Sequence, residues 1–402
     1  MKNSKAKDTF SVLIPDGESW LSYSVQSCLA QIPGVEVIVL SNNNLDPMRF
    51  SRNTGQFYSY VQNEDEDDDE AKLAAIYETL DRAKVDVVLP IDTQTMRLLS
   101  THQTALQALT ALAPIPDVEA IDIASNKWLL AKWLQKHHVP CPETILYRAN
   151  KKFEQALQAL TFPILLKPTE QVEDLGSGGR GIHIFEQPSE VLEFCKDNAT
   201  VDYVVQSFIN GYDIDCSVLC RDGKIEAYTI QKGFMDGQGQ FSPPAGIDLF
   251  HDDNAYEVVK TLVAKMNWTG IAHFDLRYDE HDQQVKVIEI NARFWGSLLG
   301  SFYAGVNFPH LTCLAGLERV MPKTKFQPLR YVNGRAAAKI WYQQCIGKKS
   351  AEVYFDNSAL DFMIKDPLPK VVSYYSKTLS KAASLLNISN TYTLQHYLKN
   401  KS

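Results

Sequence analysis

Three side chains with oxygen ligands gather in one short segment at the spacing of a β-hairpin. Residues 271–297 contain two strand-like runs, and a turn centred on Asp282 would place Asp275 opposite Glu289, with Asn291 two residues farther along the same face. Two facing carboxylates repel each other and destabilise a sheet unless a cation or a proton lies between them. Carboxylate and amide oxygens, without thiolate or imidazole, suit Mg²⁺. The segment therefore predicts a magnesium site.

The same register gives the hairpin an apolar side, formed by two facing pairs: Phe274 with Ile290, and Leu276 with Ile288. The polar side would also carry Arg277. The alternative to a metal site is a solvated polar face on which Arg277 and Arg293 neutralise the acids. The adjoining sequence "EINAR" (289–293) favours the metal.

A second segment with chemical potential is "LGSGGRGIHIF" (175–185), which has four glycines in six positions and runs into an alternating strand pattern. A glycine turn can simply join two strands. It can also let main-chain N–H groups close around phosphate oxygens, where a Cβ atom would interfere. This stretch alone does not decide between the two.

The bulk properties are those of a globular protein with more than one domain. The chain has 402 residues, 45% of them hydrophobic and 22% charged, and this length exceeds that of a single ordinary core. The formal net charge of −8 gives no electrostatic reason to expect a nucleic acid as partner. No apolar run is long enough for a membrane span and no apolar signal core is visible, so we expect a cytoplasmic protein. Seven scattered cysteines argue against a disulfide framework and a zinc site.

The elements that must position these segments change character along the chain. Up to about residue 120, short apolar strands alternate with helices, which predicts a doubly wound parallel sheet of Rossmann-like α/β type. Hairpins and helices without strict alternation follow, which predicts α+β structure. The acidic run 64–70 is interpreted as a solvated loop. The basic tail 377–402 could dock on the body, pair with a second copy as a homodimer, or touch an acidic membrane surface.

Six motifs together resemble the ATP-grasp superfamily, in that family's order and approximate spacing, over about residues 125–300. The motifs are "SNKWLL" (125–130), "LLKP" (165–168), the glycine stretch, "VVQSFINGYD" (204–213), "HFDLRYD" (273–279) and "EINARFWGS" (289–297). The nearest branch is similar to biotin carboxylase and the large subunit of carbamoyl-phosphate synthase. The resemblance implies a Rossmann-like domain (1–122), a small ATP-grasp subdomain (123–205), a large one (206–330) and a C-terminal strand with a helical tail (331–402).

The resemblance also implies a role for each matching position. Nucleotide phosphates would be contacted by Lys127 and Lys167 and by the glycine loop, which consists of Gly176, Ser177, Gly178, Gly179, Arg180 and Gly181. Adenine would be held by Gln206, Ser207, Phe208 and Ile209, and the ribose by Asp213, where the family usually has glutamate. The Mg²⁺ or Mn²⁺ ligands would be Asp275, Glu289 and Asn291, and Arg293 would lie near the transferred phosphoryl group. Arg277 is a second candidate catalytic residue, which the family motif does not assign.

The implied reaction is ATP-dependent ligation, in which a carboxylate becomes an acyl phosphate and an amine or similar nucleophile displaces phosphate. A phosphotransferase or a non-catalytic nucleotide-sensing module would use the same nucleotide site. The substrates would be a small carboxylate and an amine, with Arg277, Lys232 and Arg335 as candidate contacts, the last in a strand expected at 333–341. His273 is interpreted as a structural histidine.

Overall fold

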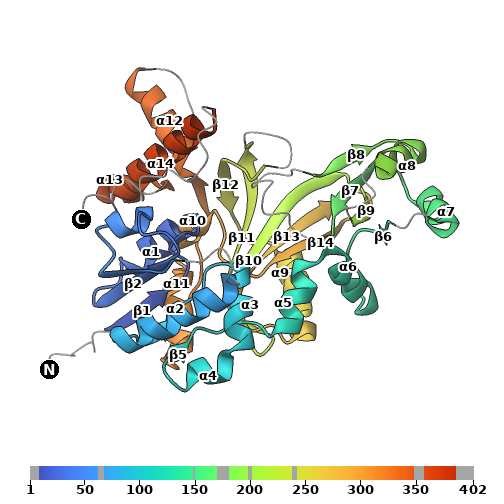
Figure 1. Cartoon of the computed structure of the whole chain (residues 1–402). Helices are drawn as coiled ribbons and strands as arrows, with labels where there is room; N and C mark the ends of the chain where they lie inside the picture. The colour runs from blue at the N-terminus through green and yellow to red at the C-terminus, as the bar shows by residue number, and fades with distance from the viewer. Residues whose placement is uncertain are drawn as a thin grey trace.

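The N-terminal region of the computed structural model is a five-stranded parallel sheet between helices (Figure 1). The structure describes residues 9–61, 68–147, 150–169, 181–197, 202–237, 242–347 and 357–385. The strand order is β3-β2-β1-β4-β5. The strands are β1 (Phe10–Ile14), β2 (Val35–Ser41), β3 (Gln56–Ser59), β4 (Val87–Val88) and β5 (Ala111–Leu112). Helices cover both faces of such a sheet, which explains why β1 is buried at every position and apolar at all but Ser11. The predicted Rossmann-like domain is confirmed.

Its helices are α1 (Ser22–Leu29), α2 (Asp68–Arg82), α3 (Thr93–Thr101), α4 (Gln103–Gln107) and α5 (Val118–Ser125), with a short 3₁₀ turn at Pro47–Phe50. The expectation of a solvated loop for the whole acidic run 64–70 is wrong at its end. Asp68, Asp69 and Glu70 form the first turn of α2, where negative charge is stabilised by the helix dipole. The remainder of the run lies outside the described residues.

A small antiparallel sheet follows helix α6 (Lys127–Lys136). Its strand order is β6-β9-β7-β8, from β6 (Thr144–Leu146), β7 (Ile164–Pro168), β8 (His183–Phe185) and β9 (Tyr203–Ser207). Helices α7 (Lys151–Ala159) and α8 (Pro188–Asp197) pack on it with a separate core that includes Phe153, Leu157, Val191 and Val205. In Figure 1 this unit forms a lobe at the right of the molecule.

A larger antiparallel sheet carries the predicted hairpin. Its order is β14-β13-β10-β11-β12-β15, from β10 (Gly211–Arg221), β11 (Lys224–Met235), β12 (Gly246–Leu249), β13 (Gly270–Asp279), β14 (Gln284–Asn291) and β15 (Leu329–Val332). Helices α9 (Asp253–Met266), α10 (Leu298–Tyr303) and α11 (Phe308–Gly316) cover it. One hydrophobic core joins this sheet to the N-terminal parallel sheet. Parallel and antiparallel units therefore coexist in one chain, as predicted.

The hairpin register is confirmed near the carboxylates and wrong beyond them. Asp275 pairs with Glu289 and Phe274 with Ile290, but a bulge between Asp275 and Leu276 makes Leu276 pair with Val287 instead of Ile288. Val287 is buried and Ile288 only half-buried. Ile288 is the extra residue of the bulge in β14. The bulge compensates for a turn that lies one residue away from its predicted register, so both strands keep their apolar sides against the core.

The C-terminal region corrects a second expectation. Residues 333–341 are not a strand: they begin helix α12 (Gly334–Cys345), and the preceding strand β15 pairs with β12. Three consecutive alanines after Asn333 favour a helix, because alanine has the highest helix propensity. Helices α13 (Leu360–Lys365) and α14 (Leu368–Leu385) follow, and the rest of the basic tail lies outside the described residues.

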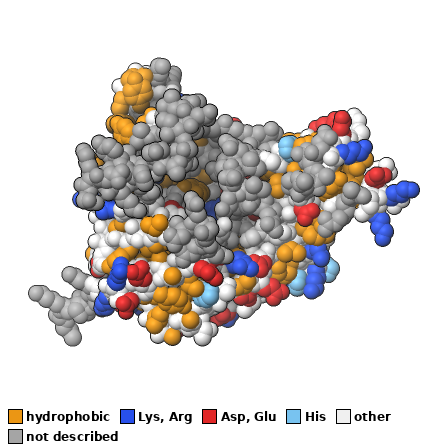
Figure 2. All heavy atoms as spheres, in the orientation of Figure 1, with side chains coloured by type: hydrophobic (Ala, Val, Ile, Leu, Met, Phe, Trp, Pro, Cys, Tyr) orange, Lys and Arg blue, Asp and Glu red, His pale blue; other side chains and the backbone are white. Residues whose placement is uncertain are grey.

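The surface of the described residues is mostly of mixed charge. In the view of Figure 2, Lys and Arg side chains are interspersed with Asp and Glu, and hydrophobic side chains gather over α12. Those of Trp341, Tyr342 and Ile346 are exposed. No helix in the described ranges has both the length and the apolar character needed to cross a membrane. All seven cysteines are free thiols.

The predicted domain limits fall inside elements of the structure. The limit at 122/123 lies within α5, that at 205/206 within β9, and that at 330/331 within β15. The four-part division of the chain stays a prediction.

Candidate functional site

A row of acidic side chains crosses three neighbouring strands of the large sheet. Glu289 on β14 pairs with Asp275 on β13, and Asp275 pairs with Asp215 on β10. The next strand, β11, continues the row with Gln231. Because directly paired residues point to the same face of a sheet, the three carboxylates share one face. We call Glu289, Asp275 and Asp215 the carboxylate row.

Asp215 is a site residue that the sequence reasoning missed. The signal was present in "DID" (213–215), since alternation places Asp213 and Asp215 on one face. What the sequence does not reveal is that β10 lies beside β13, because this pairing joins residues 60 positions apart.

Two members of the carboxylate row, Asp215 and Asp275, are poorly neutralised by the described part of the chain. Burial, and then the charge of Asp215 and Glu289, raises the pKa of Asp275 well above its usual range. Burial raises the pKa of Asp215 to about 7, against a hydrogen bond of 3.0 Å from the Gln231 amide that favours the charged form. In the part of the chain that the structure describes, neither aspartate has a lysine or arginine within ion-pair distance. An added cation or a proton would therefore stabilise these two aspartates.

His273 points to the same face as the carboxylates. Its Nε2 atom lies 3.4 Å from Asp275 Oδ1 and 4.0 Å from Asp215 Oδ2, and its Nδ1 lies 2.8 Å from the hydroxyl of Ser217. Its ring stacks on Trp295. Burial and the nearby charge of Arg293 lower its pKa to about 3, so the imidazole is neutral at ordinary pH. From the sequence alone, His273 is interpreted as a structural histidine, and the position of its side chain beside Asp215 and Asp275 is not predicted.

The end of β14 adds two groups to the row. The Asn291 amide donates to Asp275 Oδ2 at 3.3 Å, and its carbonyl oxygen accepts from Arg293 at 3.1 Å. Arg293 also donates to the main-chain carbonyl of Phe294. The predicted metal ligands Asp275, Glu289 and Asn291 therefore lie together, with Arg293 beside them.

Lysines from the small lobe complement this acidic face. Lys167, at the end of β7, is buried and donates to the side-chain carbonyl of Gln206 at 2.8 Å. Burial lowers its pKa to about 8, while the charge of Glu289 opposes that shift and that of Lys127 adds to it. Lys127 is the first residue of α6, and its main-chain N–H donates to Thr169 O at 2.8 Å. Lys167 therefore lies within electrostatic range of Glu289 and Asp275, and Lys127 lies within range of Lys167.

The linker between the two antiparallel sheets is held from β13. The Arg277 guanidinium donates to the carbonyls of Ile209 and Gly211, each at 2.8 Å, and to Asp213. It also lies over the ring of Phe208. The main-chain N–H groups of Ser207 and Phe208 already donate within the protein. Arg277 therefore has a positioning role for the predicted adenine and ribose contacts, and its predicted catalytic role stays a prediction.

Several predicted residues do not join the described site. Gly176, Ser177, Gly178, Gly179 and Arg180 lie outside the described residues, while Gly181 is described with a positive φ of 83°. Lys232 lies over Tyr212 and Phe250, on the opposite face of the sheet from the carboxylate row. Arg335 belongs to α12, and its side chain is outside the described part.

The N-terminal domain contributes one wall beside Arg293. The Thr93 hydroxyl donates to Ala292 O at 3.1 Å, and the Phe294 N–H donates to Ile91 O at 3.3 Å. These bonds join the loop after β4 directly to the end of β14. Asp92 lies in this loop. Burial and the charge of Asp16 raise the pKa of Asp92 to about 7, and the positive charge of Arg293 opposes this shift.

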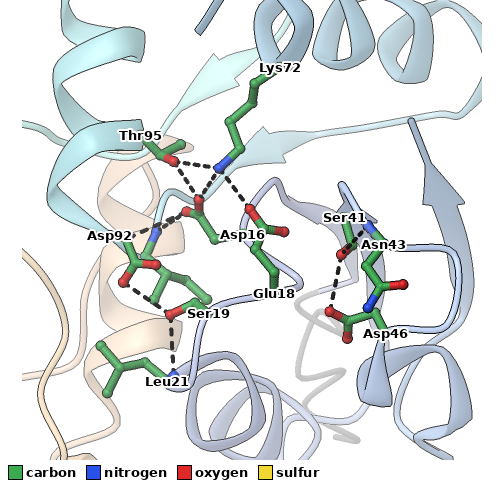
Figure 3. Close-up of polar contacts among 11 residues, drawn as sticks. Asp16, Glu18, Ser19, Leu21, Ser41, Asn43, Asp46, Lys72, Asp92 and Thr95 are labelled. Atoms are coloured by element: carbon green, nitrogen blue, oxygen red, sulfur yellow. Dashed lines mark hydrogen bonds and ion pairs between the residues drawn. The ribbon is translucent and has the colours of Figure 1, made fainter. Parts of the chain in front are cut away.

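The loop after β4 is stabilised by a cluster of acidic side chains around the ammonium group of Lys72 (Figure 3). Lys72 forms ion pairs with Asp16 at 2.7 Å and Glu18 at 3.1 Å, and Ser19 donates to Asp92 at 3.0 Å. Asp16 also accepts from the main-chain N–H of Ile91 at 2.7 Å. We call Asp16, Glu18, Asp92 and Lys72 the Lys72 cluster. It fixes the loops after β1 and β4.

The donor set of the carboxylate row suits Mg²⁺. Two carboxylates and an amide oxygen on one rigid hairpin leave further coordination positions for water and phosphate oxygens, which is how Mg²⁺ is usually held. Burial is the main cause of the raised pKa values of Asp215 and Asp275, so an ionised carboxylate at either position is stabilised by a cation beside it.

Comparisons with known proteins agree with this geometry. Residues 124–297 match the family described as an ATP-grasp domain. The chain is similar to the D-aspartate ligase of Enterococcus faecium, with 24% identity over 323 residues that cover 75% of each chain. Its fold is similar to N5-carboxyaminoimidazole synthetase from Staphylococcus aureus complexed with ADP, with a TM-score of 0.63, 17% identity and coverage of 82% and 83%. It is also similar to L-amino acid ligase from Bacillus licheniformis, with a TM-score of 0.58, 17% identity and coverage of 80% and 78%.

Proposed function

This chain belongs to the ATP-grasp superfamily of ligases, and on that premise we propose that it uses ATP and Mg²⁺ to join a carboxylate to an amine. The observation that carries the proposal is the opposition of charges across the site. The carboxylate row lies on one sheet, and Lys167 approaches it from the other. A nucleotide triphosphate with its metal ion would neutralise both sides.

Each group has a part in holding the nucleotide. Lys167 and Lys127 bind phosphate oxygens, the linker 206–209 holds the base, and Asp213 holds the ribose. Asp275, Glu289 and Asn291 hold Mg²⁺, or Mn²⁺, which accepts the same oxygen ligands. When bound, the ion neutralises charge on the phosphate oxygens.

The reaction forms and breaks bonds at two centres. A carboxylate oxygen attacks the γ-phosphorus, the bond to ADP breaks, and an acyl phosphate results. The amine nitrogen then attacks the acyl carbon, phosphate leaves, and the amine loses a proton. Arg293 lies where it can stabilise charge on the transferred phosphoryl group. The protein must also exclude water, which would hydrolyse the acyl phosphate. Because the substrate is ATP, we place the reaction in the cytoplasm.

We propose an amino acid as the carboxylate or the amine substrate. The support is the similarity to a D-aspartate ligase along three quarters of both chains, together with the fold shared with an L-amino acid ligase. Arg293 offers the charge that a substrate carboxylate requires.

The proposal is tested by ADP release from the purified protein with Mg-ATP and pairs of substrates, starting with D- and L-aspartate and other amino acids as either partner. Hydroxylamine is added as a trapping nucleophile, since it converts an acyl phosphate to a hydroxamate. Hydroxamate together with a coupled amide supports a ligase. A stable phosphorylated product indicates a phosphotransferase, and nucleotide binding without ADP release indicates a sensing module.

Glu289→Gln is the matching variant. We expect it to reduce ADP release by at least about 100-fold, because even loss of an outer-shell partner of a metal ligand costs 10–100-fold. The fold should be intact, as judged by circular dichroism and thermal melting. Glu280→Gln, in the exposed turn of the same hairpin, is the control and should retain activity. Undiminished turnover in Glu289→Gln would refute the metal assignment.

A further inference from the structure

One nitrogen ligand lies among the oxygens of the carboxylate row, and the proposed magnesium chemistry has no use for it. The Nε2 atom of His273 and one carboxylate oxygen each from Asp215 and Asp275 all lie within 4.8 Å of one another. All three residues are at least partly buried, and they project from the adjacent strands β10 and β13.

The distances within this group are poor for hydrogen bonds. At 3.4 Å and 4.0 Å, the contacts from Nε2 exceed the 2.7–3.2 Å range of N–H···O bonds. Ligand atoms that surround one divalent ion at about 2.1 Å lie about 3.0–3.5 Å apart in octahedral or tetrahedral arrangements. The His273–Asp275 distance already fits such an ion, and the Asp215 contact needs only a small closure.

The other ring nitrogen has the partner that metal-binding histidines usually have. Ser217, which is buried, lies 2.8 Å from Nδ1. If Nδ1 carries the proton and donates to the Ser217 hydroxyl, the lone pair of Nε2 faces the two carboxylates. A lone pair facing two ionised carboxylates is repulsive unless a cation or a proton lies between them. The hydrogen bond at the other ring nitrogen fixes the orientation of the ring, as at metal-binding histidines.

We propose that His273, Asp215 and Asp275 form a site for a divalent transition-metal ion, such as Mn²⁺ or Co²⁺, beside the Mg²⁺ ligands. An imidazole donor favours these ions over Mg²⁺, which prefers oxygen. Asp275 would belong to both sites, as in paired metal sites whose ions lie about 3.5–4 Å apart. The inference rests on the proposed function only through the shared Asp275.

The test uses the full-length, metal-stripped protein without nucleotide, titrated with Mn²⁺ and followed by the loss of the free-ion electron paramagnetic resonance signal. Wild type should bind Mn²⁺, and pulsed measurements should show coupling to an imidazole nitrogen. His273→Gln should weaken Mn²⁺ binding at least about 10-fold and abolish that coupling, with Mg²⁺ binding changed less. His281→Gln, in the exposed hairpin turn, is the matched control and should behave as wild type.

Asp215→Asn is a second variant that keeps the imidazole and should also weaken Mn²⁺ binding. Thermal melts of the metal-free variants identify any that fail to fold. The inference is overturned if Mn²⁺ does not bind nucleotide-free wild type at millimolar concentration, or if His273→Gln binds it unchanged with the nitrogen coupling retained. Mn²⁺ binding through His273 without ATP turnover would overturn the proposed function alone, whereas turnover without a His273 effect would overturn only this inference.

Discussion

The Lys72 cluster and the carboxylate row are both partly buried groups of three acids, and they are neutralised differently. In the Lys72 cluster an ammonium group lies 2.7 Å from Asp16 and 3.1 Å from Glu18. In the carboxylate row, the described ion-pair contacts of Asp275 and Asp215 involve only His273. This imidazole is neutral at ordinary pH and does not offset their charge. Asp16 and Glu18 therefore have a cation within the folded protein, whereas Asp275 and Asp215 have no lysine or arginine partner among the described ion pairs. This difference fits a structural role for the Lys72 cluster and the ligand-binding role that we propose for the carboxylate row.

Lys72, which is partly buried, and Lys167, which is buried, show the same contrast. Lys72 is surrounded by carboxylates, and although burial opposes it, the charges of Asp16 and Glu18 raise its pKa. Lys167 is bonded to the neutral amide of Gln206, and burial lowers its pKa to about 8. Lys72 has its anions within the protein, whereas Lys167 would gain an anion from the nucleotide that we propose as its ligand. Mg-ATP would supply both the missing cation and the missing anion.

The largest expected effect is the loss of stability on removal of the internal cation. Lys72→Met leaves Asp16 buried without its partner, and breaking one side of such a pair costs about 3–5 kcal/mol. Urea unfolding measures this free energy. Lys84→Met, at an exposed position, should change it by less than about 0.5 kcal/mol. Because Asp16→Asn removes the stranded charge, the double variant should recover part of the loss. Equal stability of Lys72→Met and wild type would show that the cluster does not hold the domain.

Removing one charge from the carboxylate row should raise the free energy of unfolding, whereas removing Lys72 should lower it. Asp275→Asn removes a repelling charge and keeps the shape of the side chain, so the free energy of unfolding without metal should rise. We expect about 1 kcal/mol, because 39% of the side chain is exposed and solvent screens the repulsion. The folded-state pKa of Asp275 is raised, so the cost of its charge is absent only below the ordinary value of 3.8 and grows as the pH rises towards the folded-state pKa.

Urea unfolding of Asp275→Asn at several pH values between 4 and 8 tests this. The stabilisation should increase with pH, and added Mg²⁺ should stabilise wild type more than the variant. Asp81→Asn, on the exposed face of α2, is the control. A variant that is less stable than wild type at pH 8 in the absence of metal would mean that the row is already neutralised within the protein.

The sequence predicts the local part of this contrast and misses the long-range part. The facing pair Asp275 and Glu289 follows from strand alternation and one turn, which are both local features. The sequence pattern does not predict the bulge after Asp275. Asp215 and Lys72 reach their clusters through pairings of distant strands and helices. No periodicity encodes such contacts, so both were missed. The error at 333–341 is different, because the alanines after Asn333 were a local signal for a helix.

The smallest and most specific effect is a change in proton uptake. Burial of the Lys167 ammonium costs stability at pH 7, and this cost disappears as the pH rises from about 8 towards the ordinary lysine value of 10.5. Phosphate oxygens beside Lys167 would favour its charged form. Binding of Mg-ATP should therefore take up close to one proton at about pH 9, where most of the free protein has a neutral Lys167, and almost none at pH 7.

Calorimetric titrations in two buffers with different ionisation enthalpies measure this uptake. Lys167→Met should abolish it and weaken nucleotide binding, whereas Lys152→Met, exposed on α7, should leave both unchanged. If Lys167→Met still takes up a proton at pH 9, the group that charges on binding is a different one. The difference between Lys72 and Lys167 would then reflect only how each side chain is packed, and Lys167 would not be the residue that binds the phosphate groups.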